Sequence, residues 1–582
     1  MESTTRKSLE RIISQKALQM SSSTTCKIWV LGFFSGVCIT YLFLVAFSSF
    51  PISAPRLVYS RSQRASLQNS RLPDSECHTD GDFIVQQKLG IAKNGQLSDQ
   101  EKIMNLYATW SNLLGAKDAA NEAPLGGIQN SRVPQAPHVE NCKLNVERNW
   151  HFDSRGGNGS FPAWTLWRGL LGLELFKHAS SKRPEHMQFA HLEEFEGAYP
   201  PWVVGSDENN YPLTRQVQRD IWIHQHPQDC NHPSLRFLVA DWEKLPGFGM
   251  GAQFAGMTGL LAIAINEKRI LVTNYYNRAD HGGCQGSSWS HWSCYFFSET
   301  SLACRERAFE LMSSPEAWRD GIITVKENYT SKQLWAGRIP RVWGEPWSYL
   351  QPTTDIDGSL LMHHRKMDRR WWRAQAIRYL MRFQTEYTCN LLNEARHAAF
   401  GLQSAKLVIE NLPADLPKVT ANRPQPDIER FVWSDYKPWM PRPLLSMHVR
   451  MGDKACEMKV VGFANYMDLA DRIKERFPTL QNIWLSTEMM EVIEKTRLYP
   501  HWNFYYTNVT RQAGNMTMAT YEASLGREIS TNYPLVNFLM ATEADFFVGA
   551  LGSTWCYLID GMRNTGGKVM AGYLSVNKDR FW

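Results

Sequence analysis

The sequence predicts an α/β fold in which helices cover both faces of a largely parallel β-sheet. One observation is a series of short apolar runs, typical of strands buried on both sides; these runs are Leu235–Ala240, Arg269–Thr273, Leu444–Val449, Asn482–Ser486 and Asp545–Ala550. The other is that stretches with helical character alternate with them, namely Ala252–Glu267, Trp371–Ala399, Tyr466–Phe477 and Thr554–Asn564. Strands that alternate with helices indicate parallel pairing.

An apolar segment near the N-terminus predicts a membrane anchor. Ile28–Phe50 contains no charged residue, and a helix that spans a bilayer needs roughly 20 apolar residues. We therefore expect a transmembrane signal-anchor over residues 28–50 after a cytosolic tail over residues 1–27. A cleaved signal peptide is the alternative, and the length of the stretch argues against it. Basic residues lie on both sides: Arg6, Lys7, Arg11, Lys16 and Lys27 before it, and Arg56, Arg61, Arg64 and Arg71 after it.

Two features indicate that the rest of the chain lies in the secretory pathway. N-glycosylation sequons begin at Asn158, Asn328, Asn508 and Asn515. Most of the 11 cysteines follow the apolar segment, and their spacing fits no zinc pattern. Disulfides in an oxidising compartment are the better interpretation, with Cys284, Cys294 and Cys304 bridging loops.

Composition divides the chain after the anchor. Residues 51–150 are polar and broken by Pro and Gly, which is typical of a stalk with one short helix near Asp99–Leu114. Pro-rich stretches at Pro413–Pro417 and Pro424–Pro443 then separate two globular parts, 151–420 and 421–582. The net charge of +6 is mild and no basic run occurs, so we expect no nucleic-acid partner.

Ligands bind beyond the carboxyl ends of the strands in such sheets, so the residues that follow each strand are the candidates for a site. The first strand is followed by Gly247, Gly249 and Gly251 and then by an apolar helix. Such glycines let the backbone approach a phosphate at a helix N-terminus. A plain tight turn is the alternative. An NAD site would need an acidic residue at the end of the next strand, where Asn274 stands.

Three later strands are also followed by polar residues. His448, Arg450, Asp453, Lys454 and Glu457 follow one strand, Ser486-Thr487-Glu488 follows another, and Ser553 and Thr554 open a helix after a third. A guanidinium at a strand end can hold a diphosphate through parallel hydrogen bonds. The alternatives are an Arg450–Asp453 ion pair, a hydrogen-bonded core histidine and a helix cap. Together these segments suit a nucleotide diphosphate.

In four segments the chain resembles a known family, the α-1,6-fucosyltransferases of N-glycan cores and the related bacterial nodulation fucosyltransferases. Gly247–Gln253 resembles G-C-G-Y-G-C-Q, His448–Lys454 resembles H-V-R-R-T-D-K, and Ala544–Cys556 resembles A-D-F-L-V-C-T-F-S-S-Q-V-C. A fourth segment resembles W-W-x-x-Q-x-x-x-Y-L-x-R-P-Q through Trp371, Trp372, Gln375, Tyr379, Leu380, Arg382 and Gln384. The four occur in the family's order over roughly residues 210–575.

The resemblance implies a GT-B-like arrangement with a Rossmann-like subdomain that binds the nucleotide sugar, and GDP-fucose as donor with no cofactor. Arg450 resembles the arginine on the β-phosphate, and His448 and Asn537 resemble guanine-side contacts. Ser553 and Thr554 resemble a phosphate-binding pair. Glu457 lies near the position of the catalytic base, and Asp453 and Lys454 match residues that orient it.

The chain also departs from the family pattern. Met451 replaces a second arginine, Asn537 replaces an aspartate, and Phe248 and Ala252 replace two loop cysteines, as expected if one bridge is lost. Gly549 replaces the partner of Cys556, so this thiol is either free or paired elsewhere. These departures leave open the alternative that the chain is a non-catalytic descendant of the family.

The expected activity is the inverting, metal-independent transfer of fucose from GDP-fucose to a glycan or glycoprotein acceptor. The catalytic body would be lumenal, on a single-pass type II protein of the Golgi membrane, and a homodimer is possible through the stalk. Alternatives are a protein O-fucosyltransferase and a non-catalytic lumenal protein that binds glycan or nucleotide. Asp355 and Asp357 mimic a D-x-D metal motif, but no buried strand clearly precedes them, so we expect no metal site.

Overall fold

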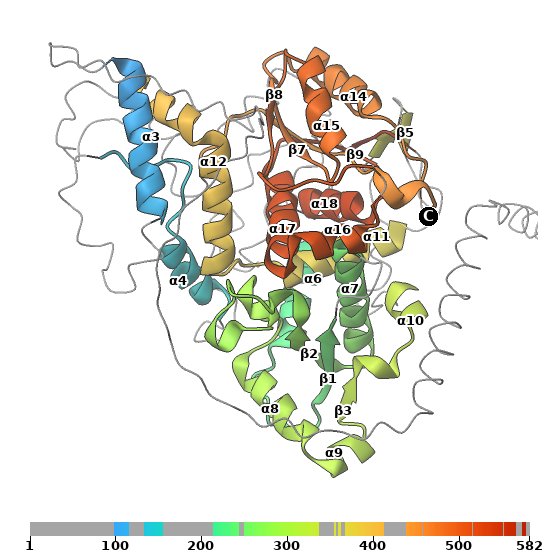
Figure 1. The fold of residues 1–582 in the computed structure, drawn as a ribbon. Coiled ribbons are helices and arrows are strands. Elements are labelled where there is room, and N and C mark those ends of the chain that lie inside the picture. The colour runs from blue at the N-terminus through green and yellow to red at the C-terminus, as the bar shows by residue number, and fades with distance from the viewer. Residues whose placement is uncertain are drawn as a thin grey trace, which may run out of the picture. The chain divides into compact units, whose positions relative to one another are not determined.

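The structure is a computed structural model (Figure 1). It describes residues 98–115, 133–154, 214–243, 249–336, 354–356, 359–361, 367–411, 438–456, 458–514, 516–550, 552–565 and 573–577. The predicted tail and anchor lie outside these ranges, as do Gly247 and Glu457. Among the helices within them, none is long and apolar enough to cross a membrane.

The first of two sheets contains three parallel strands, β1 (Arg236–Trp242), β2 (Arg269–Tyr276) and β3 (Ile323–Val325), in the order β2-β1-β3. Alternate residues of β1 face opposite sides, as a strand dictates. Leu238 and Ala240 belong to the core that contains α7 (Met250–Asn266), whereas Phe237 and Val239 belong to the core under α8 (Leu302–Met312). This double burial explains the apolar runs. The other helices of this region are α6 (Thr214–Gln225), α9 (Pro315–Arg319) and α10 (Ser331–Ala336).

The second sheet has the order β5-β4-β10-β9-β6-β7-β8. Its strands are β4 (Thr354–Ile356), β5 (Ser359–Leu361), β6 (Leu444–His448), β7 (Asn482–Ser486), β8 (Asn503–Tyr505), β9 (Phe546–Gly549) and β10 (Tyr573–Ser575). The β4–β5 pair is antiparallel and the other pairs are parallel. β4 and β5 precede residue 421 in the chain, yet they join this sheet. The division of the chain at residue 421 stays a prediction.

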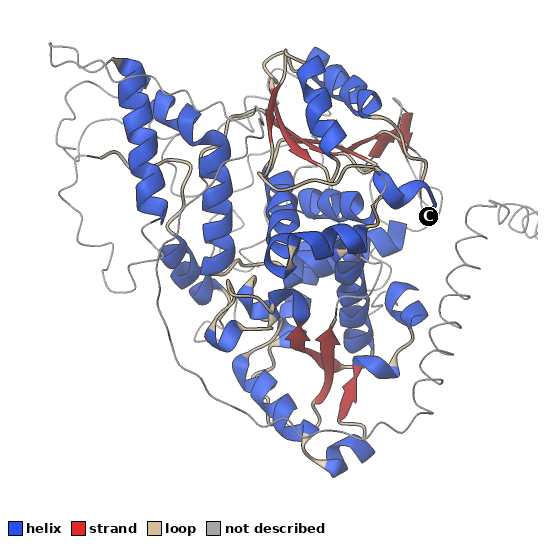
Figure 2. Cartoon of the chain, in the orientation of Figure 1, coloured by secondary structure: helices blue, strands red, loops and turns tan. Residues whose placement is uncertain are grey.

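Helices cover both faces of the second sheet, as Figure 2 shows. Leu445 and Met447 of β6 face α14 (Phe463–Arg476), which is followed by α15 (Met490–Lys495). Leu444 of β6 and Phe547 of β9 face the core that contains α17 (Arg527–Glu543) and α18 (Thr554–Thr565). The predicted α/β class, with helices around parallel strands, is therefore confirmed.

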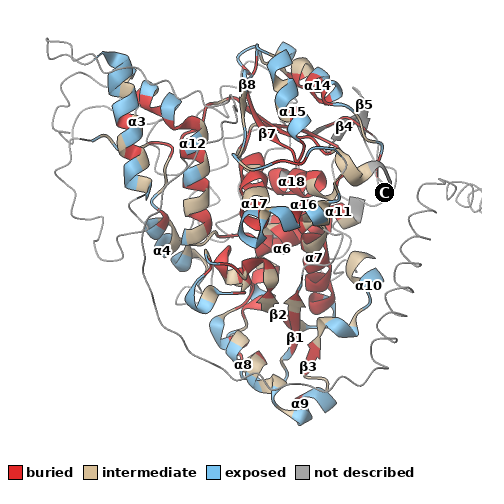
Figure 3. Ribbon diagram, in the orientation of Figure 1, coloured by how far each residue is buried: buried red, intermediate tan, exposed pale blue. Residues whose placement is uncertain are grey.

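A buried layer of helices joins the two sheets through one continuous core (Figure 3). α11 (Met367–Leu380) contacts α7 and α18. The indole N–H of Trp372 donates to the carbonyl of Thr258 in α7 at 2.8 Å. A Cβ added at Gly561 of α18 would lie 2.8 Å from Cβ of Ala374, so only glycine permits this approach of α18 to α11. Trp371 and Trp372 of α11 are both fully buried in this core.

The predicted strands and helices form, with one correction. The prediction of a single helix over Trp371–Ala399 is wrong, because the chain forms α11 and a separate helix α12 (Glu386–Asn411). Between them, the carbonyl of Phe383 accepts a hydrogen bond from the N–H of Phe297 at 3.0 Å. The hydroxyl of Thr385 then accepts from the N–H of Thr388 at 3.4 Å, as an N-cap does. The break therefore serves to pair the chain with the segment around Phe297.

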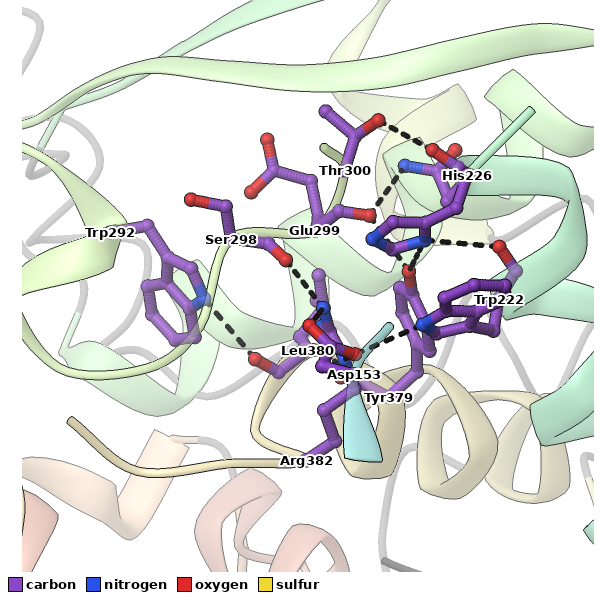
Figure 4. A network of polar contacts seen from close by, with 11 residues as sticks. Asp153, Trp222, His226, Trp292, Ser298, Glu299, Thr300, Tyr379, Leu380 and Arg382 are labelled. Atoms are coloured by element: carbon purple, nitrogen blue, oxygen red, sulfur yellow. Dashed lines mark hydrogen bonds and ion pairs between the residues drawn. The ribbon is translucent and has the colours of Figure 1, made fainter. Parts of the chain in front are cut away.

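Arg382, at this break, lies at the centre of a buried polar network (Figure 4). Its guanidinium donates to both carboxylate oxygens of Asp153 at 2.7 Å and to the carbonyl of Ser298 at 2.6 Å. The indole of Trp222 donates to the same carboxylate at 2.9 Å, and the hydroxyl of Tyr379 donates to the carbonyl of Glu299 at 2.7 Å. The fourth family-like segment is thus used to hold the fold together.

Three disulfides join cysteines beyond residue 140, as predicted: Cys142–Cys389, Cys230–Cys304 and Cys284–Cys294. Cys284–Cys294 spans only 10 residues, whereas Cys142–Cys389 spans 247 and ties α4 (Cys142–Phe152) to α12. Among the described cysteines, Cys556 is buried and is not part of a disulfide.

A pair of histidines lies where α3 (Asp99–Gly115) meets α12. His138 Nε2 lies 2.9 Å from His397 Nδ1, and His397 Nε2 lies 2.7 Å from the hydroxyl of Ser111 in α3. Burial, together with the charges of His397 and Arg396, lowers the pKa of His138 to about 3. Burial also lowers the pKa of His397. Both side chains are therefore neutral in the folded protein at neutral pH.

The histidine pair predicts a loss of stability in acid. Because the folded-state pKa of His138 lies below its unfolded value near 6.5, the unfolded chain binds the proton first as pH falls. The free energy of unfolding should decrease from pH 7 to pH 5, with a contribution of up to about 1.4 kcal/mol per pH unit from His138. His138→Gln should flatten this slope in denaturant titrations. His232→Gln, at an exposed position, is the control, and an equal slope in wild type and His138→Gln would contradict the assignment.

Candidate functional site

Three helices begin at one place between the two sheets. α7 starts after Gly249, α18 starts at Thr554, and α16 (Met518–Leu525) starts after Thr517. A Cβ added at Gly251 would lie 3.1 Å from Cε3 of Trp555 and 3.6 Å from its backbone nitrogen. A Cβ added at Gly249 would lie 3.7 Å from Cγ of Met518. Gly251 therefore allows the close approach of α7 and α18, and the start of α16 lies beside Gly249, so the amino ends of all three helices meet.

The electrostatic consequence is a concentration of positive potential at this point. The first N–H groups of a helix have no partner within the helix, and the helix dipole is positive at that end. Among the described residues, no side chain caps the amino end of α7, whose N-cap is Gly249. Thr517 caps α16, with its hydroxyl accepting from the N–H of Thr520 at 3.2 Å. Converging helix N-termini of this kind favour an anion.

Arg450, two residues beyond β6, lies beside the helix starts and is buried. Its Nη2 donates to Asp453 Oδ1 at 2.9 Å, and its Nη1 donates to Glu488, which follows β7. The N–H of Met451 also donates to Glu488, at 3.3 Å. The Arg450–Asp453 ion pair, which the sequence left as an alternative, is present, and Glu488 adds a second carboxylate.

Asp453 connects the arginine to the helix starts. Its Oδ2 accepts from the N–H of Met518 at 3.2 Å, so one carboxylate bridges Arg450 and the first residue of α16. A hydrogen bond from the N–H of Met458 to the carbonyl of Lys454, at 3.0 Å, closes the turn after Asp453. The side chain of Met458 then lies against Gly552, where an added Cβ would be 2.5 Å from it.

The structure thus brings together most of the predicted site residues, which come from segments far apart in the sequence. The group comprises Gly249, Gly251, Arg450, Asp453, Ser553 and Thr554. Lys454 belongs to the same turn as Asp453 and is partly buried. Gly247 and Glu457 lie outside the described residues.

His448 is the last residue of β6 and is buried. Its Nδ1 lies 3.1 Å from Sγ of Cys556. Burial, together with the charge of Arg450, lowers the pKa of His448 to about 3, so the imidazole is neutral at physiological pH. Cys556 fills the space that a side chain at residue 549 would need, because a Cβ on Gly549 would be 2.8 Å from Sγ.

Asn537 is held by contacts outside this group. It lies within α17, where its Oδ1 accepts from the indole of Trp484 at 3.0 Å and its Nδ2 donates to the hydroxyl of Thr507 at 3.3 Å. Both ends of the amide are therefore used to join α17 to β7 and to the segment at residue 507. Asp355 pairs with β10 and β5 within β4, and Asp357 lies outside the described residues.

The interpretation of the sequence missed two charged residues at the site, Arg278 and Glu522. Arg278 lies two residues beyond β2, its Nε donates to Gln253 Oε1 at 2.8 Å, and its Nη2 lies 3.3 Å from Glu522 Oε2. β2 extends to Tyr276, three residues farther than the predicted end at Thr273. Had Tyr275 and Tyr276 been included in the strand, the search of strand ends would have found Arg278.

Comparisons with known proteins were made for the whole chain. No family model matches it, and no curated protein matches it either. Among solved structures, a variant of FUT1 from Arabidopsis thaliana in complex with GDP aligns with 10% identity over 61% of this chain and 78% of its own, with a TM-score of 0.27. A TM-score this low does not establish a shared fold, so membership of the fucosyltransferase family stays a prediction.

The close approach at Gly251 predicts an effect on stability. Gly251→Val should lower the free energy of unfolding by roughly 1–3 kcal/mol, because the added carbons overlap Trp555 at the start of α18. Gly256→Ala on the same helix is the control. Its added Cβ would lie 3.6 Å from Trp242, an ordinary contact, and alanine favours the helix. Denaturant titration measures both, and equal stability of Gly251→Val and wild type would contradict the close approach.

Proposed function

We propose that the amino ends of α7, α16 and α18 bind the diphosphate of a sugar nucleotide, and that the protein is a glycosyltransferase. The observation that carries the proposal is their convergence beside Arg450, at the carboxyl end of β6. Ligands of parallel sheets bind at this edge, and phosphates bind at helix N-termini. The sequence motifs add the finer proposal that the donor is GDP-fucose and the acceptor a glycan or glycoprotein.

The proposed reaction is a single displacement with inversion. An acceptor hydroxyl attacks the anomeric carbon of fucose as the bond from that carbon to the β-phosphate oxygen breaks, and its proton passes to a carboxylate. The leaving GDP takes the bonding electrons, so negative charge grows on the β-phosphate. The helix starts and Arg450 would stabilise that charge. Glu457 is the proposed base from the motif alone.

The carboxylates around Arg450 divide naturally into two roles. Glu488 is 4% exposed and holds both the guanidinium and the N–H of Met451, which suits it to fix the arginine in place. Asp453 is 29% exposed and lies nearer the solvent side of the pair. We propose that a phosphate replaces Asp453 on Nη2 of Arg450 while Glu488 stays bound. The released carboxylate could then orient the base, the role that the motif implies for Asp453.

A second candidate function is a non-catalytic protein that binds a nucleotide or glycan. Its support is the neutralisation of Arg450 by two carboxylates, together with Met451 in place of a second arginine. Thermal stabilisation by GDP without hydrolysis of GDP-fucose or transfer would favour this candidate. A protein O-fucosyltransferase would be distinguished by profiling acceptors. In each case we propose a lumenal body anchored in the Golgi membrane through residues 28–50.

Arg450→Lys tests the role of the arginine with less risk to the fold than alanine, because it keeps a cation between Glu488 and Asp453. Lysine cannot bind carboxylate and phosphate through a planar fork. Release of GDP from GDP-fucose should slow by about 10²–10³-fold. Arg382→Lys is the control, since it alters a different buried arginine, which forms an ion pair with Asp153. Turnover near wild type in folded Arg450→Lys would refute the assignment.

Removal of divalent metal ions tests whether the proposed sugar transfer is independent of metal. If the helix starts and Arg450 alone balance the leaving-group charge, sugar transfer should proceed at the same rate in excess EDTA. The measurement is the initial rate with and without chelator. A loss of activity that Mn²⁺ or Mg²⁺ restores would overturn the metal-independent mechanism and direct attention to Asp355 and Asp357.

A further inference from the structure

Each sheet places an arginine two residues beyond the carboxyl end of one strand. Arg450 follows β6 in the second sheet, and Arg278 follows β2 in the first. Both are buried, and Arg278 is only 2% exposed. Because the amino ends of α7 and α16 lie between them, the two sheets supply matching cations to one site.

The contacts of Arg278 leave one of its groups unused. Nε donates to Gln253 in the first turn of α7, and Nη2 donates to Glu522 of α16. Nη1 is buried without a hydrogen-bond partner among the described residues. A buried N–H of a charged group is costly to leave unpaired, so a state in which Nη1 finds an acceptor would be favoured.

The carboxylate of Glu522 occupies the position where an anion is expected. Its Oε1 would lie 3.6 Å from a Cβ on Gly249, the N-cap of α7, while its Oε2 lies 3.3 Å from Arg278. Glu522 is one helical turn from Met518, whose N–H is bound by Asp453. Carboxylates of the protein itself therefore pair with both arginines, Asp453 and Glu488 with Arg450 and Glu522 with Arg278.

We infer that Arg278 is a second phosphate-binding cation and that Glu522 forms an ion pair with it until an anionic ligand binds. A diphosphate that displaces Glu522 would gain Nη2 of Arg278 and supply the acceptor that Nη1 lacks. This cation would offset the absence of the second arginine that Met451 replaces. The inference rests on the proposed function, because it assigns Arg278 to the same diphosphate site.

The test compares the affinity of the full-length protein and two variants for GDP and for inorganic pyrophosphate by calorimetry. Arg278→Gln should weaken both by about tenfold or more, because it removes a charge-assisted contact. Glu522→Gln should tighten both severalfold, because it removes the competing carboxylate and keeps the shape. If the ion pair were purely structural, the Arg278 and Glu522 variants would not change the affinity for these ligands in opposite directions. Arg278→Lys, which keeps the charge, replaces Arg278→Gln if the latter fails to fold.

Arg396 and Glu140 provide a matched control. Arg396 of α12 is buried and forms an ion pair at 2.7 Å with the partly buried Glu140, which precedes α4, and Nε of Arg396 likewise has no partner among the described residues. Arg396→Gln and Glu140→Gln should lower the melting temperature without changing affinity. If wild type binds neither ligand, the proposed function itself fails. If wild type binds but Arg278→Gln binds equally well, or Glu522→Gln binds more weakly, only the role of Arg278 is refuted.

Discussion

The structure depends on the close approach of helix starts that belong to different sheets. Gly251 permits the start of α7 to contact Trp555 at the start of α18, and Met518 at the start of α16 lies beside Gly249. A side chain at Gly251 would crowd Trp555, whereas a Cβ at Gly249 would make only ordinary contacts. Three positive helix ends are thereby held in the same place. This arrangement costs electrostatic energy unless an anion or a carboxylate neutralises it.

The charged residues around the helix starts follow from that constraint. Glu488, Asp453 and Glu522 each neutralise an arginine or a helix end, and all three are contributed by the second sheet and its helices. Arg278 comes from the first sheet and pairs across to α16. Charge pairing and backbone approach thus act together at the junction of the sheets. The same pairs explain how the fold remains stable without a ligand and where a phosphate would compete.

Much of the fold and of the candidate site could be predicted from the sequence, because both depend on local patterns. The apolar runs specified doubly buried strands such as β1 and β7, and the glycines and Arg450 stood at predicted strand ends. The break between α11 and α12 was missed, because it depends on pairing with Phe297 and on Asp153, which are distant in sequence. Arg278 was missed because β2 extends through Tyr275 and Tyr276. Glu522 could not be found from sequence, since its importance comes from Gly249 and Arg278 on the other sheet.

The measurement that tests the central claim most directly is an experimental structure of the protein with GDP bound. We expect the two phosphates to lie against the backbone at Gly249–Gly251 and the start of α18, with Arg450 on a phosphate oxygen. Binding of GDP elsewhere, with the ion pair between Arg450 and Asp453 intact, would contradict it.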